Sequence, residues 1–194
     1  MLYIDAKLTE QEEKARDEMV YLFNPVLKFI LLTSNTEEFI KYGCNSCRQT
    51  AILGAGYLRK LLPDYKFDVY EGHFIERKDD KDIPYDHAFI VAHKDERYLL
   101  IDLSRTTRKL IFQETMPNLY VGIEDYDDVI QTGQDLLDLD TLLDMAEPEY
   151  FTRKKPKEIM AVIENIISGL KVLSKEEQLR FCDKIYSQTT ALKR

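Results

Sequence analysis

A thiol, an imidazole and a carboxylate occur along this chain in an order that could build an activated sulfur nucleophile. The thiol is Cys47, the imidazole is His87, and the carboxylate is Asp102, which follows an apolar run that begins at Tyr98. In such a group the imidazole takes the proton of the thiol, and the carboxylate orients the imidazole. The chemistry that this permits is attack of a thiolate on a carbonyl carbon, provided that the fold brings the three side chains together.

The residues around Cys47 predict that it is the first residue of a helix. Ser46 and Gln49 have the spacing of a capping box, which satisfies free amides at a helix start. The apolar residues that follow repeat at helical spacing and form one stripe: Ala51, Ala55, Leu58 and Leu62. A helix start favours a negative charge and hence a thiolate. Gly54 and Gly56 are unfavourable inside a helix and indicate that another backbone packs close by.

His87 and Asp102 lie in two segments that predict an antiparallel hairpin, 86–92 and 98–103, joined by the polar residues 93–96. A four-residue loop at 93–96 would place His87 opposite Asp102. A two-residue loop at 95–96 would shift the register by two residues and keep both side chains on one face. Both strands are apolar on both faces, so we expect the hairpin inside a sheet. His87 is then the expected partner of a buried Asp102.

These motifs resemble the transglutaminase-like branch of the papain-like cysteine enzymes. The similar features are Cys-Arg-x-x-Ala opening a helix at 47–51, Leu-Arg at 58–59, a glycine in the next strand at Gly72, His-Ala-Phe-Ile-Val at 87–91, and Asp-Leu-Ser at 102–104. The family often has Trp where Phe89 stands and Asp-Pro-Thr where Asp102-Leu103-Ser104 stands. The resemblance covers about residues 40–106.

The resemblance implies an α+β fold of the papain-like, transglutaminase-like type. Its core is a nucleophile-bearing helix packed on an antiparallel sheet, flanked by N- and C-terminal helices. It implies Cys47 as nucleophile, His87 as general base and then acid, and Asp102 as the group that orients His87. The Cys47 amide and an upstream donor, for which Asn45 and Asn35 are candidates, would form the oxyanion site.

The shared step of that family is thiolate attack on an amide or ester carbonyl, which gives a thioester that water or an amine then accepts. We therefore expect amide hydrolysis, deamidation or transamidation of a protein or peptide substrate, without a cofactor. The alternative is an inactive member of the same fold that acts as a protein-interaction module through its C-terminal helices. An intact set of Cys47, His87 and Asp102 argues against that alternative.

Cys44 and Cys47 form a Cys-x-x-Cys, a spacing found in redox dithiols and in half of a zinc site. The sequence contains no second such pair and three histidines in all, so we expect no metal site. A regulatory disulfide of Cys44 with Cys47 remains open. Cys182 is interpreted as core packing, His73 as incidental to the site, and His93 as a turn residue.

Composition limits the remaining possibilities. The chain has 194 residues, of which 44% are hydrophobic, and a net charge of −8, which argues against a nucleic-acid partner. Three cysteines and the absence of a basic-then-apolar leader favour the cytoplasm, and the longest apolar stretch, 25–32, is too short to span a membrane. We expect a cysteine-enzyme domain at 1–150 and a helical extension packed on it at 151–194.

Capping and periodicity predict the other elements. Expected helices are 10–23, 25–33, 36–42, an acidic amphipathic helix within 124–149, 157–173 and 175–192. Residues 77–82 are expected to be a solvated loop, and residues 109–112 a strand.

Overall fold

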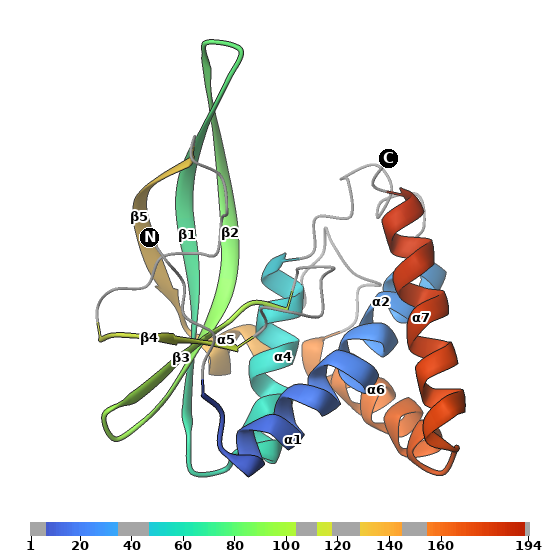
Figure 1. Cartoon of the computed structure of the whole chain (residues 1–194). Helices are drawn as coiled ribbons and strands as arrows, with labels where there is room; N and C mark the ends of the chain where they lie inside the picture. Colours follow the sequence, from blue (N-terminus) through green and yellow to red (C-terminus); the bar gives the residue numbers. More distant parts are fainter. Residues whose placement is uncertain (1–6, 35–46, 104–111, 118–128, 145–154, 193–194) are drawn as a thin grey trace.

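The computed structural model describes residues 7–34, 47–103, 112–117, 129–144 and 155–192 of the chain. Within these ranges the chain is an α+β protein in which one antiparallel sheet lies beside a group of helices (Figure 1). The strands are β1 (Lys66–Lys78), β2 (Lys81–Lys94), β3 (Arg97–Ile101), β4 (Phe112–Thr115) and β5 (Val129–Leu137). The helices are α1 (Glu10–Glu18), the π-helix η1 (Met19–Phe23), α2 (Asn24–Ser34), α4 (Cys47–Leu61), α5 (Leu139–Asp144), α6 (Pro156–Lys171) and α7 (Lys175–Leu192).

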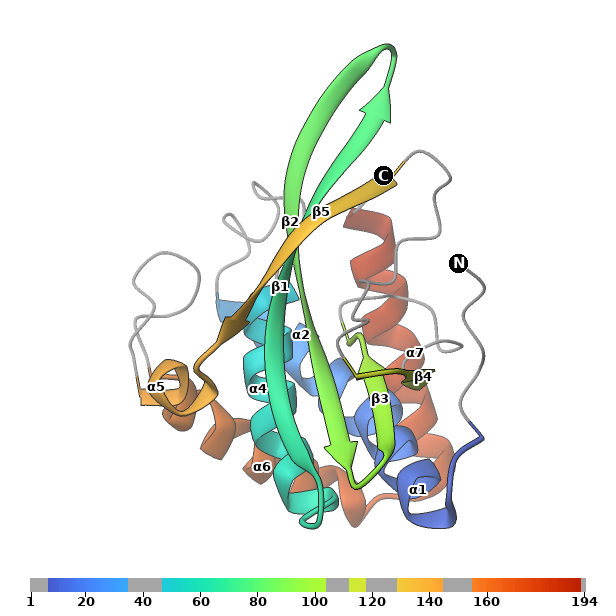
Figure 2. The same ribbon diagram turned by 90° about the vertical axis from the view of Figure 1, so that its left-hand side faces the viewer.

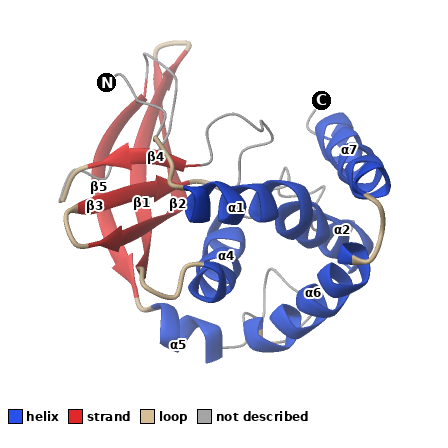
Figure 3. Cartoon of the chain, turned by 60° about the horizontal axis from the view of Figure 1, so that its bottom comes forward, coloured by secondary structure: helices blue, strands red, loops and turns tan. Residues whose placement is uncertain are grey.

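The five strands are ordered β4-β3-β2-β1-β5, and each neighbouring pair is antiparallel. Strands β2 and β3 are therefore interior, as their two-sided apolar pattern predicts. Helix α4 packs on β1 and β2, and the other long helices gather beyond it on the same side of the sheet (Figure 3). This arrangement places the start of α4 beside β2.

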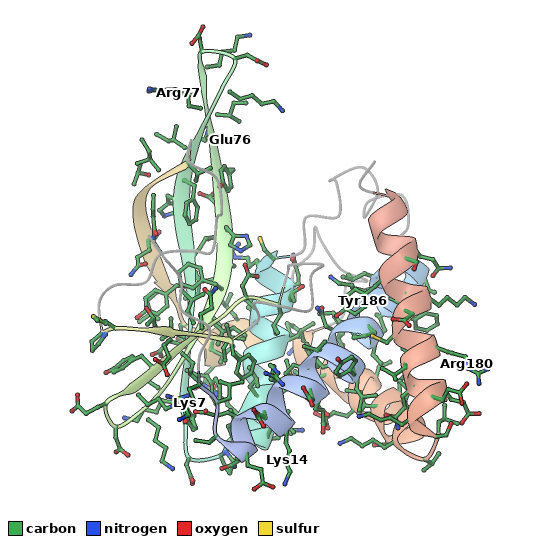
Figure 4. All side chains as sticks on the ribbon, in the orientation of Figure 1. Lys7, Lys14, Glu76, Arg77, Arg180 and Tyr186 are labelled. Atoms are coloured by element: carbon green, nitrogen blue, oxygen red, sulfur yellow. The ribbon has the colours of Figure 1, made fainter. Side chains whose placement is uncertain are left out.

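Strands β1 and β2 form a long hairpin whose far end extends beyond the rest of the sheet (Figure 2). The prediction of a loop at 77–82 is wrong, because both strands continue to a two-residue turn. Asp79 and Asp80 occupy that turn with φ of 51° and 58°, which suits the tight hairpin turn. Arg77 pairs across the strands with Asp82, and Figure 4 shows Glu76 and Arg77 far from the helices.

The prediction of an acidic helix within 124–149 is wrong for residues 129–137, because these residues form β5 and pair with β1. The apolar residues of this segment, Val129, Ile130, Leu136 and Leu137, do not alternate strictly and also fit helical spacing, so pairing with β1 decides between the two structures. Among the described residues of this range, the helical part is the short α5 (Leu139–Asp144). Of the strand expected at 109–112, residue 112 is described and begins β4 (Phe112–Thr115), while 109–111 lie outside the described residues. The expected helix at 36–42 also lies outside them.

The N-terminal helices form one continuous run of α1, η1 and α2 rather than two separate helices. The capping box of Thr9 and Glu12 starts this run as predicted. At its middle the backbone N–H of Asn24 donates to the carbonyl of Met19, five residues back. This wider π turn lets the helix pass Pro25, which has no N–H to donate.

The two C-terminal helices lie close to the predicted ranges, and Ser174 and Glu177 cap the start of α7 reciprocally. Apolar residues of α6, including Ile163 and Ile167, belong to the same buried cluster as the apolar face of α4. Among the described residues no helix is long and apolar enough to cross a membrane.

Glycine at position 54 lets α4 approach the segment that follows β3. A Cβ at Gly54 would lie 2.2 Å from Cδ1 of Leu103 and 3.2 Å from Cδ1 of Ile90. The expectation that another backbone packs close to this glycine is therefore wrong, because its near neighbours are the side chains of Leu103 and Ile90. A Cβ at Gly56 would lie 3.1 Å from Cε of Met160, so this position faces α6.

We expect Gly54→Ala to destabilise the protein although alanine favours helices. Overpacking against the buried Leu103 should cost about 1–3 kcal/mol, which exceeds the gain of about 1 kcal/mol in helix propensity. The matched control is Gly169→Ala in α6, because a Cβ there meets nothing within 4 Å. That variant should gain up to about 1 kcal/mol. Urea unfolding measures both, and a Gly54→Ala protein as stable as the Gly169→Ala protein would contradict this packing.

Candidate functional site

Cys47 is the first residue of α4 and is partly buried. The backbone amides of a first helical turn point out of the start of the helix, and together with the helix dipole they favour a negative charge there. The guanidinium of Arg48 donates to a carboxylate oxygen of Glu71 at 3.1 Å, which ties this end of the helix to β1. The predicted place of the thiol at a helix start is therefore present in the structure.

His87 on β2 and Asp102, one residue after β3, are joined by a hydrogen bond of 2.8 Å between Nε2 and Oδ2. The turn between these strands has two residues, Asp95 and Glu96, and pairs Ile90 with Ile101. Of the two registers left open by the sequence, the two-residue turn is the one found. Asp102 thus lies diagonally across from His87 and not directly opposite.

The pair is removed from solvent. Asp102 is fully buried, and the side chain of His87 is 12% exposed. A carboxylate in such a place requires a charged or donating partner, and His87 supplies it. This contact fixes the orientation of the imidazole ring, because Nε2 is held by the carboxylate.

The third member, Cys47, makes a side-chain hydrogen bond with His87. Since Asp102 holds Nε2, the ring nitrogen left to face the sulfur is Nδ1. Burial by itself would lower the pKa of His87, but Asp102 and Cys47 together raise it to about 10. The imidazole is therefore protonated at neutral pH, with a carboxylate at one nitrogen and the sulfur at the other.

The other two histidines also have aspartate partners, which the sequence analysis missed. His73 bonds Asp86 at 2.7 Å and Asp135 at 3.0 Å, and His93 bonds Asp68 at 3.1 Å. The signal for two of these pairs was the hairpin itself, since a turn at 79–80 places residue 73 opposite 86 and residue 68 close to 93. The hydrogen bonds to the two aspartates raise the pKa of the exposed His73.

Of the remaining candidates, Asn35, Asn45 and Cys44 lie outside the described residues. Cys182 is fully buried on α7, with its sulfur 3.9 Å from the carbonyl of Val20, in agreement with its interpretation as packing. In the described ranges no group of three or more His, Cys, Asp and Glu side chains is placed to hold a metal ion.

Comparisons of the chain with protein-family models, with curated proteins and with solved structures find no match. The geometry of Cys47, His87 and Asp102 is therefore the basis for inferring what this chain does.

The raised pKa of His87 predicts a defined dependence of stability on pH. A group with a raised pKa stabilises the fold fully below its unfolded value, about 6.5, and that contribution is lost as the pH rises through about 10. We expect the His87 ring to remain protonated at pH 8 in NMR titrations, and the free energy of unfolding to fall between about pH 7 and pH 10.

Asp102→Asn should lower the pKa of His87, because burial then outweighs the remaining attraction. The substitution should also lower the free energy of unfolding by about 3 kcal/mol near neutral pH, because it breaks the buried pair of His87 and Asp102. Asp68→Asn is the matched control, since it removes the aspartate partner of His93 away from the sulfur. Equal effects of the two substitutions on the His87 resonance would show that Asp102 does not hold this ring.

Proposed function

We propose that this chain is a cysteine-dependent enzyme that attacks amide carbonyls through a thioester on Cys47. The observation that carries the proposal is the set of contacts around His87, which has a buried carboxylate on Nε2 and the sulfur of Cys47 as its other partner. Burial of the pair strengthens the electrostatic attraction between a thiolate and an imidazolium.

In the proposed reaction the Cys47 thiolate adds to the carbonyl carbon of the amide, and the oxygen becomes an oxyanion. The backbone amide of Cys47, at the start of α4, is one donor suited to that charge. Protonated His87 gives its proton to the departing nitrogen, and the C–N bond breaks to leave the thioester.

His87 is then neutral and takes a proton from the acceptor, water or an amine, as that acceptor adds to the thioester. The C–S bond breaks, the acid or the new amide leaves, and the thiolate–imidazolium pair is restored. Asp102 remains ionised throughout and keeps the ring aligned.

We assign the fold, within the proposal, to the papain-like superfamily and its transglutaminase-like branch. What supports this is the order of the parts: a cysteine opening a helix that packs on an antiparallel sheet, then a histidine on one strand and an aspartate directly after the next. Helices from both ends of the chain flank this arrangement, as the resemblance implies.

The proposed substrate is an amide in a protein or peptide, with hydrolysis or deamidation ahead of cross-linking. The proposed location is the cytoplasm, because a thiolate nucleophile has to stay reduced to act. An inactive module that binds partners through α6 and α7 is the alternative outcome of the experiment below.

The test compares His87→Gln with His93→Gln, since each histidine is bonded to one aspartate and only His87 contacts the sulfur. The measurement is the rate at which iodoacetamide alkylates Cys47 at pH 6.5, with the labelled residue located by mass spectrometry. We expect this rate to fall about 100-fold or more in His87→Gln. In His93→Gln the alkylation rate of Cys47 should stay within about two-fold of the rate in the unsubstituted protein, because this substitution leaves His87 in place. Slow and equal labelling of Cys47 and Cys182 in the unsubstituted protein would favour the interaction module.

Three product assays on a casein substrate separate the acyl acceptors: new N-termini report hydrolysis, ammonia reports deamidation, and incorporation of a fluorescent primary amine reports transamidation. Cys47→Ala should abolish whichever product forms while leaving the thermal unfolding midpoint within a few degrees. If Cys47→Ala formed product as fast as the unsubstituted protein, Cys47 would not be the nucleophile.

A further inference from the structure

A buried polar chain connects the C-terminal helix α7 to the residue after Asp102. The side-chain amide of Asn24 donates to the carbonyl oxygen of Leu103 at 2.9 Å and to the hydroxyl of Tyr186 at 3.2 Å. The hydroxyl of Tyr186 in turn donates to the carbonyl of Val20 at 3.0 Å. Asn24 is fully buried and Tyr186 is 8% exposed, so these bonds are shielded from water.

Pro25 explains why a tyrosine hydroxyl is needed at Val20. In the π turn of η1 the N–H of Asn24 bonds Met19, five residues back. The donor at the same spacing from the Val20 carbonyl would be residue 25, and proline has no N–H. Tyr186 supplies the missing donor from α7, the helix that lies against η1 and α2 in Figure 4, where Tyr186 is labelled.

The same π turn determines where the side chain of Asn24 points. An added residue in a helix rotates everything after it by about 100° relative to an uninterrupted α-helix. Here that rotation brings both amide hydrogens of Asn24 onto acceptors, one in the chain after β3 and one on α7. The side-chain oxygen of Asn24 has no hydrogen-bond partner among the described residues. A buried asparagine with an unsatisfied oxygen is costly, so its two donor bonds are the feature that accounts for it.

We infer that Asn24 and Tyr186 are positioning residues for Asp102, and that docking of α7 thereby sets the alignment of the His87–Asp102 pair. Leu103 is held from two sides, by Asn24 at its carbonyl and by Gly54 of α4 at its side chain. Asp102 is the next residue back, and its carboxylate meets His87 at 2.8 Å. A displacement of Leu103 therefore moves the carboxylate relative to the ring.

This inference deepens the proposed function, because it assigns α7 a role in assembling that site. Its readout needs no turnover, however. The ring resonances of His87 in labelled protein, assigned with His87→Gln, report the contact with Asp102 directly. Alkylation of Cys47 across pH reports the sulfur's side of the same ring.

The experiment compares Tyr186→Phe and Asn24→Ala with the control Tyr57→Phe. Tyr57 is similarly buried, and its hydroxyl donates to Glu18, so the control also loses a tyrosine hydrogen bond, but one that does not lead to Leu103. We expect the titration of His87 in Asn24→Ala to move down by about one unit or more, a ten-fold change in the proton equilibrium. Tyr186→Phe should shift it in the same direction by a smaller amount, and Tyr57→Phe should leave it unchanged.

The inference would be overturned if both variants kept the titration of His87 and the alkylation of Cys47 unchanged while their thermal midpoints fell as in Tyr57→Phe. Asn24 and Tyr186 would then stabilise the fold without positioning Asp102. If Asn24→Ala does not fold, Tyr186→Phe decides alone, because it removes a single oxygen and keeps the ring. A shifted titration in a protein that forms no acyl product would sustain the inference and reject the proposed function.

Discussion

The burial of Asp102 is the constraint on which the described site depends. A carboxylate with no exposed surface has to be paired, because an isolated charge in the interior is strongly unfavourable. His87 meets this requirement, and the bond that satisfies the acid also fixes the ring and holds a proton on it. One contact therefore serves both the stability of the sheet and the chemistry proposed for Cys47.

Leu103 joins the two elements that bring the acid and the sulfur together. Its side chain packs on Gly54, two turns into the helix that begins with Cys47, and its carbonyl is bound by Asn24. Because Cys47 and Gly54 belong to the same helix, the packing at Gly54 also limits where the sulfur can lie relative to Asp102. The glycine is thus explained by the site and not by any need for an unusual backbone angle.

The sequence predicted those parts of the fold that depend on interactions between residues close together in the chain. The capping boxes at Thr9 and Ser174 depend on residues three apart, and both are present. The common side of His87 and Asp102 was also predictable, because any even loop length preserves it. The choice between the two registers was not, since it depends on the turn at 95–96. Strand β5 was missed because its residues suit either period, and only pairing with distant β1 decides.

Aspartate partners do not by themselves mark a catalytic histidine. His73 is bonded to two carboxylates, but its side chain is 38% exposed and both acids face solvent, so water weakens these ion pairs. His93 stacks on Tyr98 and is bonded to a partly exposed Asp68. His87 differs by a fully buried acid at one nitrogen and a cysteine sulfur as its other partner. That sulfur belongs to Cys47, forty residues before His87 in the chain. The order of the residues could therefore suggest a contact of Cys47 with His87, but the packing of α4 on β2 is what produces it.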